Sequence, residues 1–231
     1  MRKGERTRQE IIRRAAPVFN QKGYDGAALS DLMGATGLEK GGIYRHFASK
    51  QALAAEAFDY AWAQTFRARV HDLGVIANSI DRLKQMVANF VERRGTIPGG
   101  CPLLNTAVDT DDGNDVLRER ARKALEGWRS YVAGIVQEGI KARQIHKHAD
   151  PRKVAMLLIS SLEGAIMVAR LTRSDEPLEV VQRYLDGYLE DALRAEPRQP
   201  PLRSWKGSDL ARPNDHRRLV SGESSEDSPW L

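Results

Sequence analysis

The sequence predicts an all-α fold, and three observations carry that prediction. Apolar residues recur at three- and four-residue spacing in nearly every segment, as they do on one face of a helix. No run shows the alternation of apolar and polar residues between turn signals that marks a strand. Short stretches rich in Gly, Pro or polar residues separate the periodic segments, and 231 residues with 41% hydrophobic content are enough for one large domain or two small ones.

The first helix is expected between Thr7 and Tyr24. Thr7 and Glu10 form a capping-box pattern at its start. Pro17 lies inside the run, where it removes a backbone donor and should bend the helix, and Gly23 should end it.

Three more helices are expected before residue 74. A short one over residues 28–36 is stopped by Gly37, and a third follows to about Phe47. Ser49 is placed to cap a long fourth helix.

Beyond Gly74 the pattern predicts helices over residues 79–94, 102–110, 115–143, 151–171 and 177–195. Pro151 and Pro177 suit the first turns of the last two, because the N–H that proline lacks is unpaired there in any case. Residues 196–231 are rich in Pro, Ser, Gly and charge, and they lack the apolar content to fold, so we expect a disordered tail.

Composition limits the class of protein. The longest apolar stretch, residues 154–162, is too short to span a bilayer, and the N-terminus lacks the apolar core of a secretory signal. The single cysteine, Cys101, excludes an internal disulfide and fits a reducing cytoplasm. No nucleophile motif, P-loop, dinucleotide fingerprint or zinc signature indicates an enzyme. We therefore expect a soluble cytoplasmic protein that is not an enzyme, with no metal, no cofactor and no membrane association.

Positive charge is confined to one end of the chain. Ten of the 36 Lys and Arg residues, but only five of the 31 Asp and Glu residues, lie in the first 50 positions, and the remaining charges balance. A confined basic surface indicates a polyanionic partner, either nucleic acid or a membrane surface. A solvated face with chance asymmetry is the alternative on charge alone.

The stretch LEKGGIYRHFASK, residues 38–50, favours DNA. Two short helices joined by a tight turn, the second one basic, form a helix-turn-helix. Apolar residues at Leu29, Leu32, Leu38, Ile43 and Phe47 would make its core. The residues left to point outward, with Lys50 just beyond, are Lys40, Gly41, Gly42, Tyr44, Arg45, His46 and Lys50. Glycines at a helix start let the backbone approach phosphates or bases, and the polar side chains supply hydrogen bonds and charge.

At these residues the sequence resembles the TetR/AcrR family of transcriptional repressors. The matching positions, in order, are Gly23-Tyr24, Asp31-Leu32, Lys40, Gly41, Tyr44, His46, Phe47, Lys50 and Leu53. The resemblance covers about residues 6–55. It implies a DNA-binding domain at residues 1–50, a helical ligand-binding and dimerisation domain at residues 51–195, and the tail at residues 196–231.

Five positions depart from the family pattern. Ala27-Ala28 stands where Thr-Ser is usual, so a hydroxyl cap and phosphate contact are absent. Thr36 and Glu39 replace the usual Ala and Ser of the turn, and Gly42 replaces Thr or Ala. These changes bear on operator sequence and affinity, not on the class of function.

The resemblance implies a ligand-responsive repressor that binds a palindromic operator as a homodimer and is released by a small apolar or amphipathic effector. Candidate effector-binding residues are Trp62, Phe66, Met86, Phe90, Cys101, Asn105, Trp128, Tyr131, Glu163 and Met167. Aromatic and Met side chains with few polar groups suit such a ligand, although ordinary core packing is the alternative for any one of them.

The last two helices are expected to pair with their copies in a second subunit. Residues 151–171 are apolar almost all round. The last helix carries an apolar stripe of Leu178, Val181, Leu185, Tyr188, Leu189 and Ala192. The alternative is that both helices bury these faces inside their own domain.

Two further sites are weaker hypotheses. Cys101, at a Gly-rich approach to a helix, would sense redox or electrophiles if its pKa were lowered, but a lone cysteine is more often an inert small hydrophobe. His146 and His148 alternate on a loop before Asp150, an arrangement that rarely holds a metal.

Two other functions compete with that of a ligand-responsive repressor. One is an enzyme on a helical scaffold, and the other is a protein that coats DNA or membrane without specificity.

Overall fold

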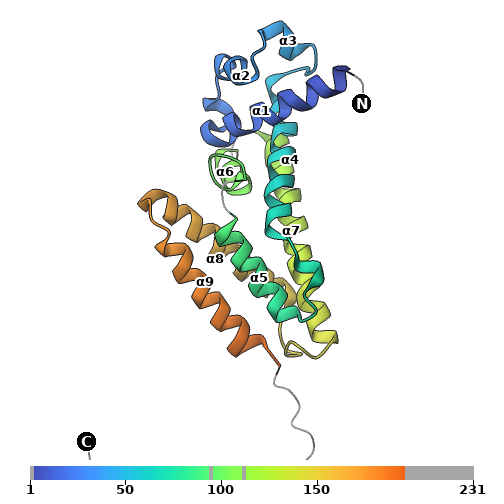
Figure 1. Cartoon of the computed structure of the whole chain (residues 1–231), viewed down its shortest axis with the longest axis vertical. Helices are drawn as coiled ribbons and strands as arrows, with labels where there is room; N and C mark the ends of the chain where they lie inside the picture. Colours follow the sequence, from blue (N-terminus) through green and yellow to red (C-terminus); the bar gives the residue numbers. More distant parts are fainter. Residues whose placement is uncertain (1–2, 94–95, 111–112, 196–231) are drawn as a thin grey trace, which may run out of the picture. The chain divides into compact units, whose positions relative to one another are not determined.

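The computed structural model describes residues 3–93, 96–110 and 113–195, and within them the structure is helical apart from one β-bridge between Ile145 and Arg194 (Figure 1). The all-α prediction is therefore confirmed. The helices are α1 (Lys3–Gly26), α2 (Leu29–Thr36), α3 (Lys40–Tyr44), α4 (Lys50–Arg69), α5 (Ser79–Glu92), α6 (Pro102–Asp109), α7 (Asp115–Lys141), α8 (Pro151–Thr172) and α9 (Glu176–Gly187), with a 3-10 turn at Leu73–Val75 and a π-helical turn at Tyr188–Leu193. The predicted tail lies outside the described residues.

The first helix begins earlier than the capping pattern predicts. Helix α1 already includes Lys3, and the Thr7 hydroxyl donates to the Lys3 carbonyl at 3.1 Å from inside the helix. The Glu10 carboxylate binds Arg13 and Arg14 at 2.6 and 2.5 Å instead of a backbone N–H. The capping-box prediction was wrong because ion pairs at three- and four-residue spacing satisfy Glu10 within a longer helix.

Gly23 interrupts α1 and fixes its last turn against α6. The backbone runs helically through Pro17 and leaves helical geometry at Gly23, whose φ is 74° and ψ 174°. This region is open almost only to glycine. The Tyr24 N–H, just beyond the break, donates to the Asp109 carboxylate at 2.7 Å. A Cβ on Gly23 would lie 2.6 Å from the same carboxylate, so the glycine permits this close contact.

Helices α1 to α3 and the start of α4 enclose a small apolar core. Its buried side chains are Ile11, Ile12, Ala15, Leu32, Ile43, Phe47 and Leu53, with Leu29 and Leu38 half-buried at its edge. All five predicted core positions of the helix-turn-helix therefore pack as expected. The last of these three helices is shorter than predicted, and residues 45–48 form a turn in which the Ile43 carbonyl accepts from the N–H groups of His46 and Phe47.

Helix α4 belongs to both cores of the described chain. The Ser49 hydroxyl caps it by accepting from the Ala52 N–H at 3.0 Å, as predicted. Leu53 packs into the small core, whereas Phe58 one turn later packs into the larger one. A helix rises about 1.5 Å per residue, so α4 spans roughly 30 Å from the helix-turn-helix into the second core.

The larger core lies among α5, α7, α8 and α9, with α8 between α7 and α9 (Figure 1). Helix α8 is long and apolar enough, by length and composition, to cross a membrane, but 44% of its most apolar window is buried inside the chain. Residues 151–172 run as one helix across Glu163, which is why this helix exceeds the apolar stretch that the sequence suggested. Its buried face makes it a central element of the core.

The apolar stripe of the last helix faces inward. Leu178, Leu185 and Leu189 are fully buried against their own domain, so the alternative that the sequence left open holds for this stripe. The apolar residues that α9 exposes lie on another face, at Val180 and Tyr184. Apolar residues at helical spacing show that one face of a helix is buried, but they do not show which element covers that face.

We expect Gly23→Ala to lower the free energy of unfolding by about 1–3 kcal/mol, because the backbone conformation is strained for alanine and the new Cβ displaces Asp109 from the Tyr24 N–H. Urea denaturation followed by circular dichroism measures this. The matched control is Gly127→Ala in α7, where an added Cβ meets nothing within 4 Å. It should stabilise by up to about 1 kcal/mol, since glycine is unfavourable inside a helix. Equal effects of the two substitutions would contradict this account of Gly23.

Candidate functional site

The turn between α2 and α3 is built by local hydrogen bonds. Gly37 has φ 69° and donates its N–H to the Met33 carbonyl, which closes α2. Thr36, a departure from the family pattern, is buried, and its hydroxyl donates to the Leu32 carbonyl at 2.7 Å. The threonine therefore serves the turn itself.

The missing Thr-Ser before α2 is compensated in part by one carboxylate. Asp31 accepts from the Ala28 N–H at 3.0 Å and pairs with Lys22 at 2.6 Å. These two contacts, the lysine first, hold the pKa of Asp31 below its usual value. The helix start is thus capped from inside by Asp31, and no hydroxyl remains at Ala28 to bind a phosphate.

Helix α3, the turn after it and the first residue of α4 carry the predicted polar residues. Lys40, Gly41 and Arg45 are exposed, and no ion pair within the described residues involves Lys40 or Arg45. The half-buried members of the set are Gly42, Tyr44, His46 and Lys50. Unpaired cations on an exposed helix are available to a polyanion, because no internal carboxylate competes for them.

No contact inside the chain explains why positions 41 and 42 of α3 are glycines. A Cβ on Gly41 would meet nothing within 4 Å, and one on Gly42 would touch Leu38 at 3.4 Å, an ordinary contact distance. Neither glycine has a positive φ. The fold itself therefore does not require glycine at position 41.

Lys50 is partly engaged inside the chain. Its ammonium group lies 4.6 Å from the centre of the Tyr24 ring, which itself stacks on Phe19 with centroids 6.5 Å apart. A cation over an aromatic face gains about 0.5–1 kcal/mol at a partly exposed site. The Gly23-Tyr24 pair of the family pattern thus orders Lys50 beside the helix-turn-helix.

The predicted effector residues surround a buried cation that the sequence reading missed. Arg69, at the end of α4, is 4% exposed, and its guanidinium lies 4.1 Å from the ring centre of Trp128, 4.5 Å from that of Phe90 and 5.3 Å from that of Trp62. Arg69 follows Phe58 and Trp62 at helical spacing on α4, and that periodicity was the available signal.

Arg69 is neutralised by Glu163 of α8 and contacts Cys101. One guanidinium nitrogen, Nη2, lies 3.2 Å from Glu163 Oε1 and 3.1 Å from Cys101 Sγ, and the thiol donates to the same carboxylate oxygen at 3.0 Å. Three buried polar atoms nearby have no partner within the described residues: Arg69 Nη1, Glu163 Oε2 and Trp128 Nε1. A buried ion pair whose second atoms stay unpaired is costly to the fold.

The other predicted effector residues divide into three groups. Met86 is buried, and Phe66 is half-buried beside Tyr131, which is 36% exposed and meets the Phe66 ring edge-on. Met167 is 48% exposed on the outer face of α8 and does not join the buried group. Asn105 is occupied by structural hydrogen bonds, described next.

Asn105 of α6 joins three segments of the chain. Its amide donates to the Asn20 carbonyl at 2.9 Å and to the Gly99 carbonyl at 2.9 Å, and its side-chain oxygen accepts from Arg170 of α8 at 3.1 Å. Asn20 in turn donates to the carbonyls of Pro98 and Gly100 at 2.9 and 3.1 Å. Helix α6, which starts beside Cys101, is therefore fastened to the DNA-side helix α1.

The histidines before α8 are not gathered into a metal site. No group of three or more His, Cys, Asp or Glu suited to a metal occurs in the part of the chain that the structure describes. Asp150 instead caps α8, accepting from the N–H groups of Arg152 and Lys153 at 2.9 and 3.2 Å. The carboxylate thus has a structural role.

These features define a helix-turn-helix protein with a second helical domain and a buried polar centre, and comparisons with known proteins place it in a family. Residues 11–57 match the model of bacterial regulatory proteins of the tetR family, and residues 79–185 match the tetracyclin repressor-like C-terminal domain. A TetR transcriptional regulator from Chloroflexus aurantiacus is 41% identical, with a TM-score of 0.81 over 85% of this chain and 100% of that one. The chain belongs to the TetR family of DNA-binding transcriptional regulators.

Two relatives carry more specific descriptions. The transcriptional repressor DhaR of Mycobacterium sp. strain GP1 is 29% identical over 74% of this chain and 86% of its own length. A CifR cysteine mutant complexed with double-strand operator DNA shares the fold at a TM-score of 0.69 and 23% identity, over 77% of this chain and 94% of that one. The class that these relatives define is one of transcriptional regulators.

We expect Cys101 to resist alkylation in the folded protein. The thiol is 2% exposed, and burial raises its pKa to about 12, against a smaller lowering by Arg69. Because the thiolate is the nucleophile, iodoacetamide at about pH 8 should leave the native chain unmodified and alkylate it fully in guanidinium chloride. Mass spectrometry reads this directly, since Cys101 is the single cysteine. Native alkylation at the rate of a free thiol would instead favour the sensor hypothesis.

Proposed function

We propose that this chain is a ligand-responsive repressor that binds a palindromic operator as a homodimer in the cytoplasm. In this proposal residues 1–50 bind DNA, and a small apolar or amphipathic effector bound within residues 51–195 releases the operator. The observation that carries the proposal is the exposed face of α3, where unpaired cations flank a glycine that the fold does not need. The operator complex of CifR supports the same use of this fold.

The surface for a second subunit is proposed on α8 and α9. Met156, Met167 and Leu171 are 48, 48 and 78% exposed and fall at helical spacing on one side of α8. Val180 and Tyr184 of α9 are 47 and 69% exposed. Large exposed apolar side chains on two packed helices favour protein association, and a twofold dimer matches the two half-sites of a palindrome.

Two physical links join the proposed effector region to the DNA-binding helices. Helix α4 runs from Lys50, beside α3, to Arg69 at the buried centre. Helix α6 runs from the neighbourhood of Cys101 to Asp109, which holds the Tyr24 N–H. An effector that binds one arrangement of these helices better than the other shifts the spacing of the two α3 helices in the dimer.

Binding without sequence preference is the second candidate function, since the basic N-terminal region alone would bind any duplex. The two functions differ in their readout. A sequence-specific repressor protects an imperfect palindrome, such as one beside its own gene, against a large excess of unrelated DNA, whereas a coating protein shows only a steep salt dependence.

We expect Gly41→Ala to weaken operator binding by about tenfold or more, because the added methyl group meets the DNA backbone or a base edge, while the thermal midpoint stays unchanged or rises slightly. Electrophoretic mobility shift and thermal melting measure the two quantities. Gly127→Ala in α7 is the matched control and should leave binding unchanged. Lys50→Ala or Tyr44→Ala should weaken binding to all DNA about equally. If Gly41→Ala bound the operator with full affinity, α3 would not lie in the DNA interface.

We expect Leu171→Glu to convert the dimer to a monomer, because a carboxylate would be buried in an apolar contact. Size-exclusion chromatography with light scattering measures the mass. Val75→Glu replaces a side chain that is 86% exposed in the 3-10 turn and should leave the mass unchanged. A monomeric wild-type chain, or a dimer that survives the Leu171 change, would contradict the proposed surface.

A further inference from the structure

The buried centre around Arg69 borders a small cavity whose wall is basic. The cavity, of about 20 Å³, is lined by Thr65, Arg69, Asn89, Phe90, Arg93, Thr96, Gly100, Cys101 and Ile166. Two arginines are present, and the lining residues within the described chain include no carboxylate. Glu163, the partner of Arg69, pairs with its Nη2, and Cys101 of the lining donates to the same carboxylate oxygen at 3.0 Å.

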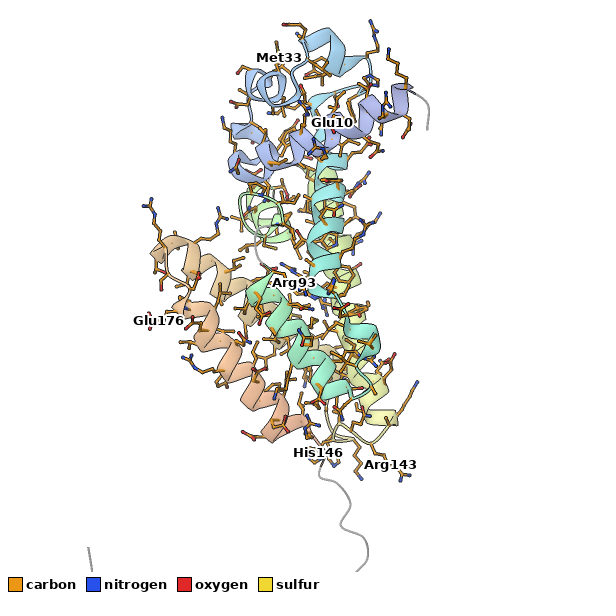
Figure 2. The ribbon with its side chains drawn as sticks, viewed as in Figure 1. Glu10, Met33, Arg93, Arg143, His146 and Glu176 are labelled. Carbon is orange, nitrogen blue, oxygen red and sulfur yellow. The ribbon has the colours of Figure 1, made fainter. Side chains whose placement is uncertain are left out.

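The arginines of this wall are held in place with donors to spare. The Arg69 side chain is 95% buried, at 5% relative exposure, and its Nη1 has no partner. Arg93 lies at the C-terminal end of α5 (Figure 2) and is exposed. Its Nε donates to Asn89 Oδ1 at 3.2 Å. The hydroxyls of Thr65 and Thr96 lie 3.2 Å apart on the same wall. The set offers guanidinium and hydroxyl donors, which suit an oxyanion.

We propose that this cavity receives the carboxylate of a small organic acid, which is the class of effector to which the repressor responds. The carboxylate accepts from Arg69 Nη1 and from Arg93, and the apolar part of the acid lies against Phe90 and Ile166. The proposal rests on the function proposed above, since it names the effector of that same domain. An organic acid fits better than an inorganic anion because the wall combines the arginines with an aromatic ring and an aliphatic side chain.

A wider groove adjoins the cavity and carries charges of both signs. It measures about 830 Å³, shares Gly100 and Ile166 with the cavity, and is also lined by Arg170, Arg173, Glu92 and Asp175. Gly100 has φ 93°, and a Cβ there would lie 2.7 Å from a terminal nitrogen of Arg170, so that guanidinium sits against the wall between the two spaces.

Binding in this cavity acts on the links to DNA. A space of about 20 Å³ holds roughly one water molecule, so a carboxylate must displace the lining segment 96–101. That segment supplies the carbonyls of Pro98, Gly99 and Gly100 to Asn20 and Asn105. Its displacement therefore loosens the hydrogen bonds that fasten α1 to α6.

Isothermal titration calorimetry of the full chain, without DNA, tests the site with straight-chain carboxylates from acetate to octanoate. At least one acid should bind saturably, and its uncharged amide should bind about tenfold to a hundredfold more weakly, as should inorganic phosphate. Arg93→Gln should weaken binding of the same acid by about tenfold or more. Arg67→Gln, which removes an exposed cation from α4 outside the cavity, is the matched control and should change nothing.

Arg69→Lys is a second variant, which retains the buried charge but loses the two-nitrogen geometry of the guanidinium. Provided that its melting curve shows a folded chain, it should bind the acid more weakly than the wild type. The proposal is wrong if none of the acids binds, if an amide binds as tightly as its acid, or if Arg93→Gln leaves the affinity unchanged. Operator release by an uncharged compound, with no acid bound, would contradict this inference but not the repressor function. Acid binding by a chain that recognises no operator would contradict the repressor function but not the proposed acid site.

Discussion

The buried guanidinium of Arg69 is the interaction on which the arrangement of the larger domain depends. A cation removed from water must be compensated nearby, and helices from five parts of the chain converge to do so. Trp62, Phe90 and Trp128 supply ring faces from α4, α5 and α7, and Glu163 supplies the counter-charge from α8. Cys101, at the start of α6, completes the contact. The compensation is incomplete, since Arg69 Nη1 has no partner within the described residues.

The same centre explains why α6 is short and fixed at both ends. Its first residue follows Cys101, and its last residue, Asp109, meets the backbone of α1 where Gly23 leaves helical geometry. Between them Asn105 ties α1, the Gly99 segment and α8 together. A helix of eight residues has few contacts of its own, so its position follows from the elements at its two ends.

The sequence predicted the helix-turn-helix better than the domain behind it, for a physical reason. The core of the small unit depends on near neighbours, so Leu32, Ile43 and Phe47 could be placed from spacing alone. The charged centre depends on residues up to 94 positions apart, Arg69 and Glu163, and no local pattern pairs them. Asn105 was predicted as a ligand contact, whereas its side chain binds Asn20, which lies on a helix 85 positions earlier. Local periodicity predicts which face is buried, but not which distant polar groups meet there.

The last helices show how far periodicity carries an argument about assembly. Leu178, Leu185 and Leu189 of the regular stripe are buried in the domain's own core, whereas Val181 and Tyr188 are half-buried and Ala192 is exposed. What remains exposed is the less regular set, with Leu171 and Tyr184 the most exposed among them, on helices whose other faces are already satisfied. An apolar side chain that the fold does not bury carries more information about association than one that it does, because the chain could have replaced it by a polar residue without loss of its core. By the same logic the bare backbone at Gly41 says more about DNA than the cations around it, since a solvated surface tolerates cations anywhere but gains nothing from a missing side chain.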